Sequence, residues 1–370
     1  MKFTVEKQSF EKAIMTALGA VSSKTAIPAL EGLLLTTTDK TLTLTGYDLE
    51  IGITSTILCD IDEEGSIILP AGKLSEIVRA LPGDTITITV DPDGKTELVS
   101  GPVIFNIIGT AFYEFPPLPK FECHNTIIIS QAKLQSMIRQ TVFAVAQTEG
   151  KPIFTGCLFE VNGEDLRIVG VDGYRLALRN EKVKCTATEP LKFVVPGKTL
   201  NRLVRMLDEV ENEVHINLAE RNVLFNIENN TLVTRLIDGE FLNYKKTLVM
   251  DRNIELVADV RSFTSSIRRA SLIINERQRS PIKLHFNDDV VTLECVSPIG
   301  KVEDCFRVSS SGGDITIGFN NKYLLDAFVN TREESVKIYF KDPLSPMVIT
   351  PLEGDAFIFL VLPVRLKDGG

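Results

Sequence analysis

The segment VPGKT, at positions 195–199, ends like a phosphate-binding loop. Such a loop reads G-x-x-x-x-G-K-[ST], because its glycines let successive backbone N–H groups surround the phosphates. The position five residues before Gly197 holds Lys192 instead of glycine, and Pro196 has no N–H to donate. Half of the phosphate cradle is missing, so the segment is better explained as a strand, a turn and the start of a helix.

Histidine and cysteine are also poorly placed for chemistry. The three histidines form no H-x-x-x-H pair, and the six cysteines are scattered without a C-x-x-C pair. These spacings argue against a metal site and against a His-based catalytic triad. Scattered thiols are typical of a reducing compartment. We therefore expect a cytoplasmic protein with no metal and no cofactor.

The bulk composition is that of a globular protein. The chain has 370 residues, which suits two or three domains, and it is 44% hydrophobic and 24% charged. Its first residues contain no apolar run that would fit a signal peptide, and the longest apolar run, 356–364, is too short to cross a bilayer. No membrane partner is expected.

The junction at Pro196 belongs to a threefold repeat. Matched positions recur at spacings of 123–126 residues, and an earlier set of prolines recurs at 124–129. Such periodicity indicates copies of one structural unit. The Gly-Lys pair is not kept in the third copy, which indicates an architectural role for the junction. The matched residues are Pro70, Pro196 and Phe319, and Pro28, Pro152 and Pro281.

Each copy is predicted to hold two helices and several short strands. Apolar residues recur at helical spacing, for example Phe10, Ile14 and Ala17, whereas segments such as 42–45 alternate apolar and polar residues. Extended linkers rich in proline and aromatic residues join the copies at 114–122 and 239–248. We expect an α+β fold of three tandem similar domains, each with two helices on antiparallel sheet. The predicted domains are 1–120, 121–246 and 247–370.

Positive charge is concentrated in the predicted helices. These windows hold 13 Lys or Arg residues against four Asp or Glu, whereas the rest of the chain has a net charge of −18. A surface formed by such helices would attract the phosphate backbone of duplex DNA without reading its bases. Basic residues are also common on any exposed helix face, so the charge alone leaves both interpretations open. The windows are 7–20, 73–80, 131–145, 198–208, 260–272 and 320–329.

With these features, the chain resembles the bacterial DNA polymerase III beta subunit, the sliding clamp or processivity factor of DNA replication. The resemblance runs over positions 1–366 and depends on the order and spacing of several short stretches. They are Met1-Lys2-Phe3, GVDGYRLA at 170–177, VPGKTLNRL at 195–203, GEFLNYKKTL at 239–248, SPIGKVED at 297–304 and LVLPVRL at 360–366.

The resemblance implies a non-enzymatic DNA clamp fold in which two chains close head to tail into a ring. The ring encircles double-stranded DNA regardless of sequence, and the helices line its hole. A closed ring is held by topology, so each phosphate contact can be weak. The DNA-binding candidates are Lys24, Lys73, Arg79, Arg139, Lys198, Arg202, Arg205, Arg268 and Arg269.

A peptide pocket is the second implied site. In the family it takes short linear motifs from the polymerase III alpha subunit, the clamp loader, other polymerases and repair proteins. Read from the residues, an apolar floor is supplied by Leu176, Leu362, Val364 and Leu366. A rim for carboxylates is supplied by Arg175 and Arg365. The matching positions are Phe154, Val171, Gly173, Tyr174, Arg175, Leu176, Leu242, Lys246, Thr247, Tyr323, Leu362, Pro363, Val364, Arg365 and Leu366.

Two of these positions depart from the family pattern. Leu242 stands where proline is common, and Lys246 stands where arginine is common. The second change replaces a forked donor with a point charge, which affects the choice of client motif. The family match also places the dimer seam at Phe105, Ile107, Leu272 and Ile273, and it leaves residues 367–370 as a short tail that we expect to be disordered.

Two other functions remain open from the sequence. An enzyme would use Asp172, Arg175 and Lys198, but it would need perturbed acids or a complete phosphate loop, and the sequence offers neither. A scaffold built of repeats would bind peptides and never meet DNA. Retention on nicked circular DNA separates the clamp from the scaffold, and an ATP turnover assay exposes an enzyme.

Overall fold

The structure is a computed structural model that describes residues 1–22, 25–148, 150–248, 253–274, 280–310 and 313–366. It divides into two compact units. The N-terminal unit comprises Met1–Ala132, Lys184–Ala187 and Arg202–Leu236, and the C-terminal unit comprises Lys133–Val183, Thr188–Asn201 and Ile237–Gly370. Lys24 and residues 367–370, both named in the sequence predictions, lie outside the described residues.

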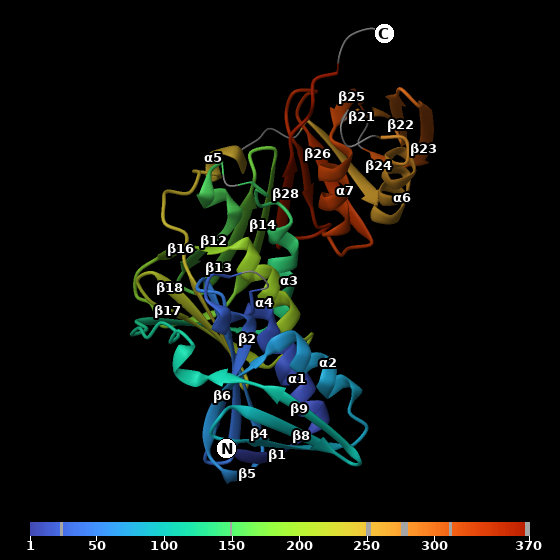
Figure 1. Cartoon of the computed structure of the whole chain (residues 1–370). Coiled ribbons are helices and arrows are strands. Elements are labelled where there is room, and N and C mark those ends of the chain that lie inside the picture. Colours follow the sequence, from blue (N-terminus) through green and yellow to red (C-terminus); the bar gives the residue numbers. More distant parts are fainter. Residues whose placement is uncertain (23–24, 149, 249–252, 275–279, 311–312, 367–370) are drawn as a thin grey trace. The chain divides into compact units, whose positions relative to one another are not determined.

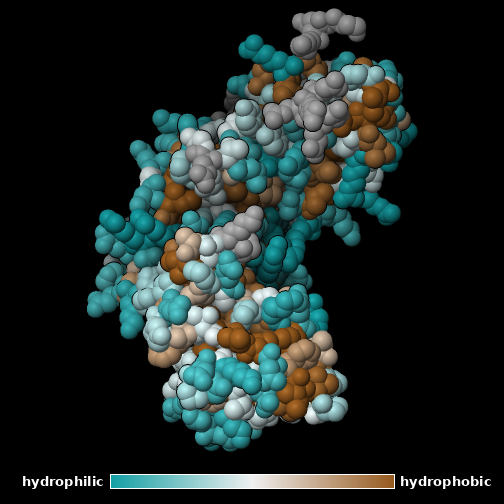
Figure 2. Space-filling model, viewed as in Figure 1, coloured by the Kyte–Doolittle hydropathy of each residue, from teal (hydrophilic) through white to brown (hydrophobic). Residues whose placement is uncertain are grey.

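The N-terminal unit begins with a five-stranded sheet in the order β5-β1-β7-β8-β9 (Figure 1). Strand β9 lies at one edge, and two of its side chains, Ile104 and Ile108, are 57% and 77% exposed. Figure 2 shows apolar side chains gathered over this part of the unit. The strands are β1 (Lys2–Glu6), β5 (Asp60–Glu63), β7 (Thr85–Val90), β8 (Lys95–Ser100) and β9 (Val103–Ile108).

A ten-stranded sheet completes this unit and joins the first repeat to part of the second. Its order is β10-β6-β2-β3-β4-β19-β18-β17-β11-β15, and the β4–β19 pair is the joint between the repeats. The strands are β2 (Gly32–Thr38), β3 (Thr41–Tyr47), β4 (Ile51–Leu58), β6 (Gly65–Pro70), β10 (Thr110–Ala111), β11 (Asn125–Ser130), β15 (Lys184–Cys185), β17 (Glu213–Leu218), β18 (Asn222–Ile227) and β19 (Asn230–Arg235).

The C-terminal unit repeats this plan. A nine-stranded sheet has the order β16-β12-β13-β14-β28-β27-β26-β20-β24, with β14–β28 as the joint between the second and third repeats, and a four-stranded sheet has the order β23-β22-β21-β25. The strands are β12 (Gly156–Asn162), β13 (Asp165–Val171), β14 (Arg175–Lys182), β16 (Leu191–Pro196), β20 (Ile254–Asp259), β21 (Ile282–Asn287), β22 (Val290–Ser297), β23 (Gly300–Arg307), β24 (Ser309–Ser310), β25 (Asp314–Phe319), β26 (Ser335–Phe340), β27 (Met347–Thr350) and β28 (Phe357–Val361).

Helices pack in pairs against these sheets. Helices α1 and α2 contact each other and the ten-stranded sheet, and α6 and α7 contact each other and strands of the C-terminal unit. The predicted apolar faces are buried, with Phe10, Ile14 and Ala17 fully inaccessible. The helices are α1 (Lys7–Ala17), α2 (Ala71–Ala80), α3 (Gln131–Val142), α4 (Gly197–Met206), α5 (Lys245–Leu248), α6 (Val260–Ser271) and α7 (Asn321–Val329), with short 3-10 turns η1 (Leu18–Ala20), η2 (Pro28–Glu31), η3 (Phe112–Glu114) and η4 (Pro152–Thr155).

The expected α+β fold is confirmed, and so are the repeated junctions. Pro70, Pro196 and Phe319 are the last residues of β6, β16 and β25. A helix follows Pro70 and Pro196 directly, and it follows Phe319 after one residue, Asn320. The segment that resembled a phosphate loop is thus the β16–α4 junction. All strand pairs of the named sheets are antiparallel.

A second repeated feature is a tight turn, which the sequence indicated at Gly173 but not at its counterpart after Asp48. The Asp48 carboxylate accepts bonds from the N–H groups of Glu50 (3.0 Å) and Ile51 (2.7 Å). Asp172 binds the N–H groups of Tyr174 and Arg175 in the same way, at 2.9 and 3.0 Å. The residue after each aspartate has a positive φ, 72° at Leu49 and 93° at Gly173. The two turns are copies of one structure.

No helix in the described part of the chain has the length and apolar character needed to span a lipid bilayer. Within those same residues, no three His, Cys, Asp or Glu side chains come together as metal ligands would.

Candidate functional site

The joint between β14 and β28 positions the C-terminal tail beside the second turn. Strand pairing sets Arg175 opposite Val361, and the Leu362 N–H then donates to the carbonyl oxygen of Tyr174 at 2.9 Å. Further along, the Val364 N–H donates to the carbonyl oxygen of Gly318 at 2.8 Å. The tail is therefore held by main-chain bonds on both sides.

Gly318 is needed for this docking. A Cβ atom there would lie 2.6 Å from Leu366 Cδ2 and 2.9 Å from the Val364 carbonyl oxygen. Both distances are too short for a real contact, so a larger residue would displace the tail. The glycine explains why the tail residues 364–366 lie flat on β25.

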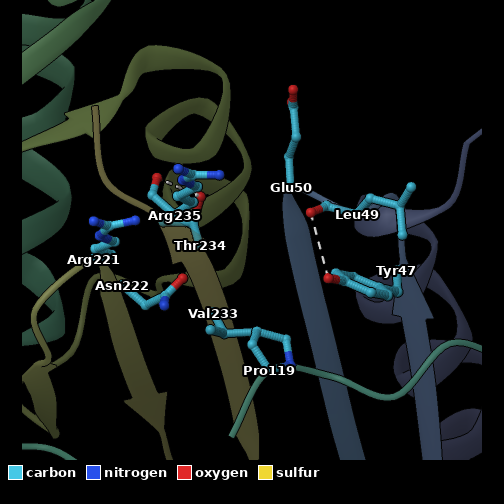
Figure 3. A pocket seen from close by; sticks show the side chains of 9 residues that line it. All are labelled: Tyr47, Leu49, Glu50, Pro119, Arg221, Asn222, Val233, Thr234 and Arg235. Atoms are coloured by element: carbon cyan, nitrogen blue, oxygen red, sulfur yellow. Dashed lines mark hydrogen bonds between the residues drawn. The ribbon is translucent and has the colours of Figure 1, made fainter. Parts of the chain in front are cut away.

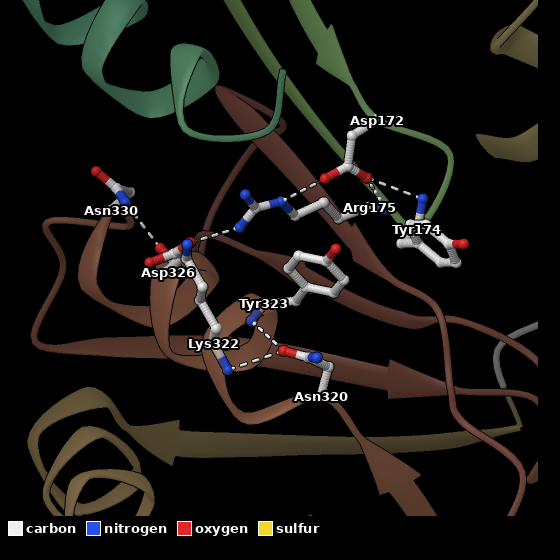
Figure 4. Close-up of polar contacts among 8 residues, drawn as sticks. All are labelled: Asp172, Tyr174, Arg175, Asn320, Lys322, Tyr323, Asp326 and Asn330. Carbon is white, nitrogen blue, oxygen red and sulfur yellow. Dashed lines mark hydrogen bonds and ion pairs between the residues drawn. The ribbon is translucent and has the colours of Figure 1, made fainter. Parts of the chain in front are cut away.

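Arg175 ties the turn to helix α7 (Figure 4). Its Nε lies 3.0 Å from Asp172 Oδ2 and its Nη1 lies 2.6 Å from Asp326 Oδ2, and its side chain is only 5% exposed. The guanidinium also lies over the ring of Tyr323, 4.6 Å from the centroid. Such an arginine bridges two carboxylates and an aromatic face at once.

Two tyrosines form the exposed face of this network. The rings of Tyr174 and Tyr323 stack with centroids 5.9 Å apart and an interplanar angle of 19°. Tyr174 is 62% exposed, so one ring faces solvent while the other covers Arg175. The N-cap residue Asn320 fixes Tyr323 by accepting its N–H at 3.1 Å. A stacked pair held in this way offers a rigid flat surface to a ligand.

A cavity of about 750 Å³ opens beside this pair. Its volume is in the range of ligand-binding pockets. Polar and apolar groups both contribute to its walls, and α3, α6 and α7 end or begin around it. It is lined by Ala146, Gln147, Thr148, Asp172, Tyr174, Arg175, Ser271, Ile274, Asn320, Asn321, Lys322, Tyr323 and Leu325.

The apolar side of the site is one cluster under the β12–β14 strands. Val171 and Leu176 are buried in it, and Phe154 packs against it with its ring edge toward Phe241, 5.8 Å between centroids. Three apolar side chains remain exposed nearby on the chain segments that border this cluster: Leu242 (47%), Leu362 (38%) and Val364 (40%). These side chains are available to an apolar partner.

Helix α5 carries Lys246 and Thr247, both exposed, and is anchored through Tyr244. The Tyr244 hydroxyl donates to Glu160 and accepts from Arg167 Nη1 at 3.3 Å. Burial and the bond to Glu160 raise the pKa of Tyr244 to about 12. Burial acts to raise the pKa of Glu160 as well, but bonds from Tyr244 and Lys192 bring it below its usual range. The phenol therefore stays neutral and the carboxylate stays charged at neutral pH.

The structure thus gathers most of the predicted peptide-site residues on connected elements. The turn at Gly173, the stacked tyrosines and the tail residues 362–366 form one continuous surface through the bonds given above. Pro363 is half-buried and Arg365 is exposed. The predicted role of Arg175 as a rim cation is wrong, because its charge is already shared by two carboxylates inside the protein.

Several residues of this site were not predicted. Asp326 is the main example, since nothing in the sequence links it to Arg175 at a separation of 151 residues. Asn320 had a usable signal, because asparagine just before an apolar helical pattern is a common N-cap. Residues 146–148 had no signal, since they line the cavity only through the way α3 ends.

The predicted DNA-binding residues are divided between the two units. Lys73 pairs with Glu76 at 2.8 Å and Arg79 with Glu11 at 3.6 Å. Arg205 and Arg268 are exposed, and neither has an ion pair with any other described residue. The N-terminal unit holds Lys73, Arg79, Arg202 and Arg205, and the C-terminal unit holds Arg139, Lys198, Arg268 and Arg269.

The predicted seam residues lie at an edge strand and a helix end. Phe105 and Ile107 are half-buried against the core of the N-terminal unit, whereas Ile104 and Ile108, which flank them along β9, are exposed. Leu272 is 82% exposed just after α6, and Ile273 packs against the core of the C-terminal unit.

Arg269 is fixed by Asp304 on the neighbouring strand β23. Its Nε lies 2.8 Å from Asp304 Oδ2, and Ser266 Oγ donates to the same oxygen at 2.8 Å. Burial acts to raise the pKa of Asp304, but the bonds from Arg269 and Ser266 lower it below its ordinary value of 3.8. The contribution of Asp304 to stability is therefore present above about pH 4 and is lost as the pH falls through the lowered pKa.

Asp304→Asn is expected to lower the free energy of unfolding at pH 7 by about 1 kcal/mol, a modest value because Arg269 is half exposed to solvent. The difference from the unchanged protein should shrink as the pH falls from 5 to 3. Urea unfolding at several pH values measures it. Glu240→Gln, which removes an exposed carboxylate without an ion pair among the described residues, is the control. A difference that stays constant with pH would contradict the assignment.

Comparison with known proteins adds to this geometry. Three family models match in order: the N-terminal domain of the DNA polymerase III beta subunit over residues 1–119, its central domain over 128–243 and its C-terminal domain over 245–365. A beta sliding clamp of Bacillus subtilis is 34% identical over 99% of this chain and all of the relative.

Solved structures agree with these matches. The sliding clamp of Bacillus subtilis superposes with a TM-score of 0.94 at 34% identity, covering 99% of this chain and all of that one. A putative beta subunit from Eubacterium rectale gives 0.92 at 34% identity, and a clamp from Pseudomonas aeruginosa bound to griselimycin gives 0.94 at 30%, each with the same coverage. This chain belongs to the family of bacterial DNA polymerase III beta subunits, the beta sliding clamps.

Proposed function

We propose that two copies of this chain close head to tail into a ring around duplex DNA and act as the processivity clamp of replication, in the cytoplasm. The chain is a sliding clamp and not an enzyme. The observation that carries the proposal is the match to clamps over 99% of the chain. The three domains would be 1–120, 121–246 and 247–370, each with two helices on the DNA side.

Exposed cations on the helices support the DNA contact. In the ring, the nine lining candidates given from the sequence would face the phosphates, with Arg205 and Arg268 the most available of the described ones. Ion pairs already occupy Lys73, Arg79 and Arg269, which weakens any single phosphate contact. A weak grip suits a ring that must slide.

Free strand edges support the head-to-tail seam. Among the described residues, β9 and β23 are edge strands of their sheets, and each leaves one row of N–H and C=O groups without a neighbouring strand. Pairing β9 of one copy with β23 of another would continue both sheets across the seam, and Ile104 and Ile108 would then be covered. The same contact would include the predicted seam residues Phe105, Ile107, Leu272 and Ile273.

The cavity beside Tyr174 and Tyr323, together with the exposed side chains Leu362 and Val364, is called here the tail groove. It would tether the clients. The stacked tyrosines and the exposed tail side chains Leu362 and Val364 suit a short extended motif with apolar anchors. The expected clients are the polymerase III alpha subunit, the clamp loader, other polymerases and repair proteins. The Pseudomonas aeruginosa relative bound to griselimycin gives a defined compound with which to probe this chain.

Topological retention tests the proposal. With a bacterial clamp loader and ATP, the chain should stay on a nicked circular plasmid through gel filtration and be released once the plasmid is cut. Blocking the cut ends with streptavidin on biotin should restore retention. Equal retention on open linear DNA would indicate ordinary DNA binding, and no retention on any template would favour the peptide scaffold. The solution mass should be about twice 41.0 kDa.

A further inference from the structure

A second cavity, of about 320 Å³, lies in the N-terminal unit beside the first of the two repeated turns. Figure 3 shows its lining side chains at the end of β3, in the turn between β3 and β4, on and just before β18, on β19, and on the linker that follows the first repeat. It is separate from the tail groove, which lies wholly in the C-terminal unit. It is lined by Tyr47, Leu49, Glu50, Pro119, Arg221, Asn222, Val233, Thr234 and Arg235.

Strand register makes this cavity the counterpart of the tail groove. The turn at Asp48 leads into β4, where Ile51 pairs with Thr234, just as the turn at Asp172 leads into β14, where Arg175 pairs with Val361. The next residue along β19 is Arg235, and the residue that follows the end of β28 is Leu362. The repeat therefore places an arginine where the tail groove has a leucine.

The floor of the cavity is apolar and closely packed. Tyr47 and Val233 are buried, while Leu49 is 53% exposed above them. A Cβ at Gly52 would lie 2.5 Å from Leu118 Cδ2 and 2.8 Å from Val233 Cγ1, so the linker lies directly on the strands. Such a floor is pre-formed and loses little entropy when a side chain enters.

One wall of the cavity is cationic. Arg221 and Arg235 are both exposed, and the Leu236 N–H donates to the Arg221 carbonyl oxygen at 2.9 Å, which holds the two arginines on adjacent chain segments. Neither guanidinium forms an ion pair within the part of the chain that the structure describes. Glu50 is the one acidic side chain among the lining residues. In a chain of net charge −9, two arginines left without carboxylates form a local site for anions.

We propose that this cavity, the arginine groove, is a second docking site that binds an extended acidic segment of a client protein. An apolar side chain of the segment enters over Tyr47, Leu49 and Val233, and flanking carboxylates bind Arg221 and Arg235. The apolar floor favours a peptide over a nucleic-acid backbone, which would use the arginines alone. The choice of a client protein as the source of the segment rests on the proposed function. The cavity and its positive charge are observed independently of that function.

Photo-crosslinking tests the proposal with a defined probe. The probe is the hexapeptide Asp-Asp-Leu-Glu-Asp-X, in which X is p-benzoylphenylalanine, and its partner probe carries Asn and Gln in place of Asp and Glu. The acidic probe should label the tryptic peptides 41–73 or 222–235, and the neutral probe should label them about tenfold less. Arg221→Glu combined with Arg235→Glu should lower labelling by the acidic probe about tenfold or more.

Lys40→Glu combined with Lys95→Glu is the matched control, since it makes the same charge change at exposed sites elsewhere in the N-terminal unit. It should leave labelling unchanged, and both double variants should keep their melting temperatures. Labelling that survives the arginine changes, or that is equal for the two probes, would overturn the inference. The inference would also be overturned if the peptide did not bind and a fluorescent dT hexamer bound in a way that depends on the two arginines. Plasmid retention reports separately on the proposed clamp function.

Discussion

Arg175→Leu is expected to lower the free energy of unfolding by roughly 3–5 kcal/mol, because it leaves two carboxylates without their cation. Asp172 is 9% exposed and Asp326 is 31% exposed, so water can replace the guanidinium only in part. The Tyr323 ring would also lose the cation that lies over it. Since Arg175 joins the turn to α7, a peptide that binds the tail groove should bind more weakly too.

Urea unfolding measures this loss. Lys182→Ala is the matched control, because it removes a cation of the same repeat whose pair with Asp165 is 69% exposed on both sides. Its expected cost is below about 1 kcal/mol. Adding Asp326→Asn to Arg175→Leu should recover part of the loss, since it removes one of the unpaired carboxylates. A cost for Arg175→Leu no larger than that of Lys182→Ala would show that the network is not a structural support.

Gly170→Val should cost roughly 3 kcal/mol, the upper part of the range for overpacking a core. A Cβ at Gly170 would lie 2.3 Å from the Thr141 carbonyl oxygen, near the end of α3. The same contact exists one repeat earlier, where a Cβ at Gly46 would lie 2.2 Å from the Ala17 carbonyl oxygen at the end of α1. In both repeats a strand runs against helix backbone with no room for a side chain, so Gly46→Val should have a similar cost.

Thermal or urea unfolding of both variants checks this prediction, with Gly72→Ala as the control. A Cβ at Gly72 meets no atom within 4 Å and its φ is not positive, so this change should be neutral or stabilise by up to about 1 kcal/mol. If the valine variants unfold like the unchanged protein, the helices can move away from the strands and the close contact is not needed.

The sequence was sufficient to predict the elements, because the elements depend on local patterns. All six predicted helical windows overlap an observed helix, and the repeated anchors Pro70, Pro196 and Phe319 end strands where expected. The apolar face of α1 is buried as its spacing indicates. Helix α5 was not expected, since its four residues are too few to show a period.

The pairing of distant segments could not be predicted from those patterns. The β4–β19 and β14–β28 joints connect strands far apart in sequence, and alternation of apolar residues gives the faces of a strand but not its neighbour. The same limit explains the error over Arg175. Its side chain looked like an exposed cation beside a turn, and only the tertiary fold brings Asp326 to it. The alternation in β9 did indicate which of its residues share a face, because Ile104 and Ile108 fall on the opposite face from Phe105 and Ile107.

The two sheet joints have a consequence for protein expression. A gene fragment that encodes only the first repeat would leave β4 without β19, and one that encodes only the third would leave β28 without β14. Each product would expose a bare strand edge and would tend to pair with further copies of itself. Fragments designed to be soluble should therefore be cut outside the β4–β19 and β14–β28 pairs. Both strands of each pair then stay on the same polypeptide.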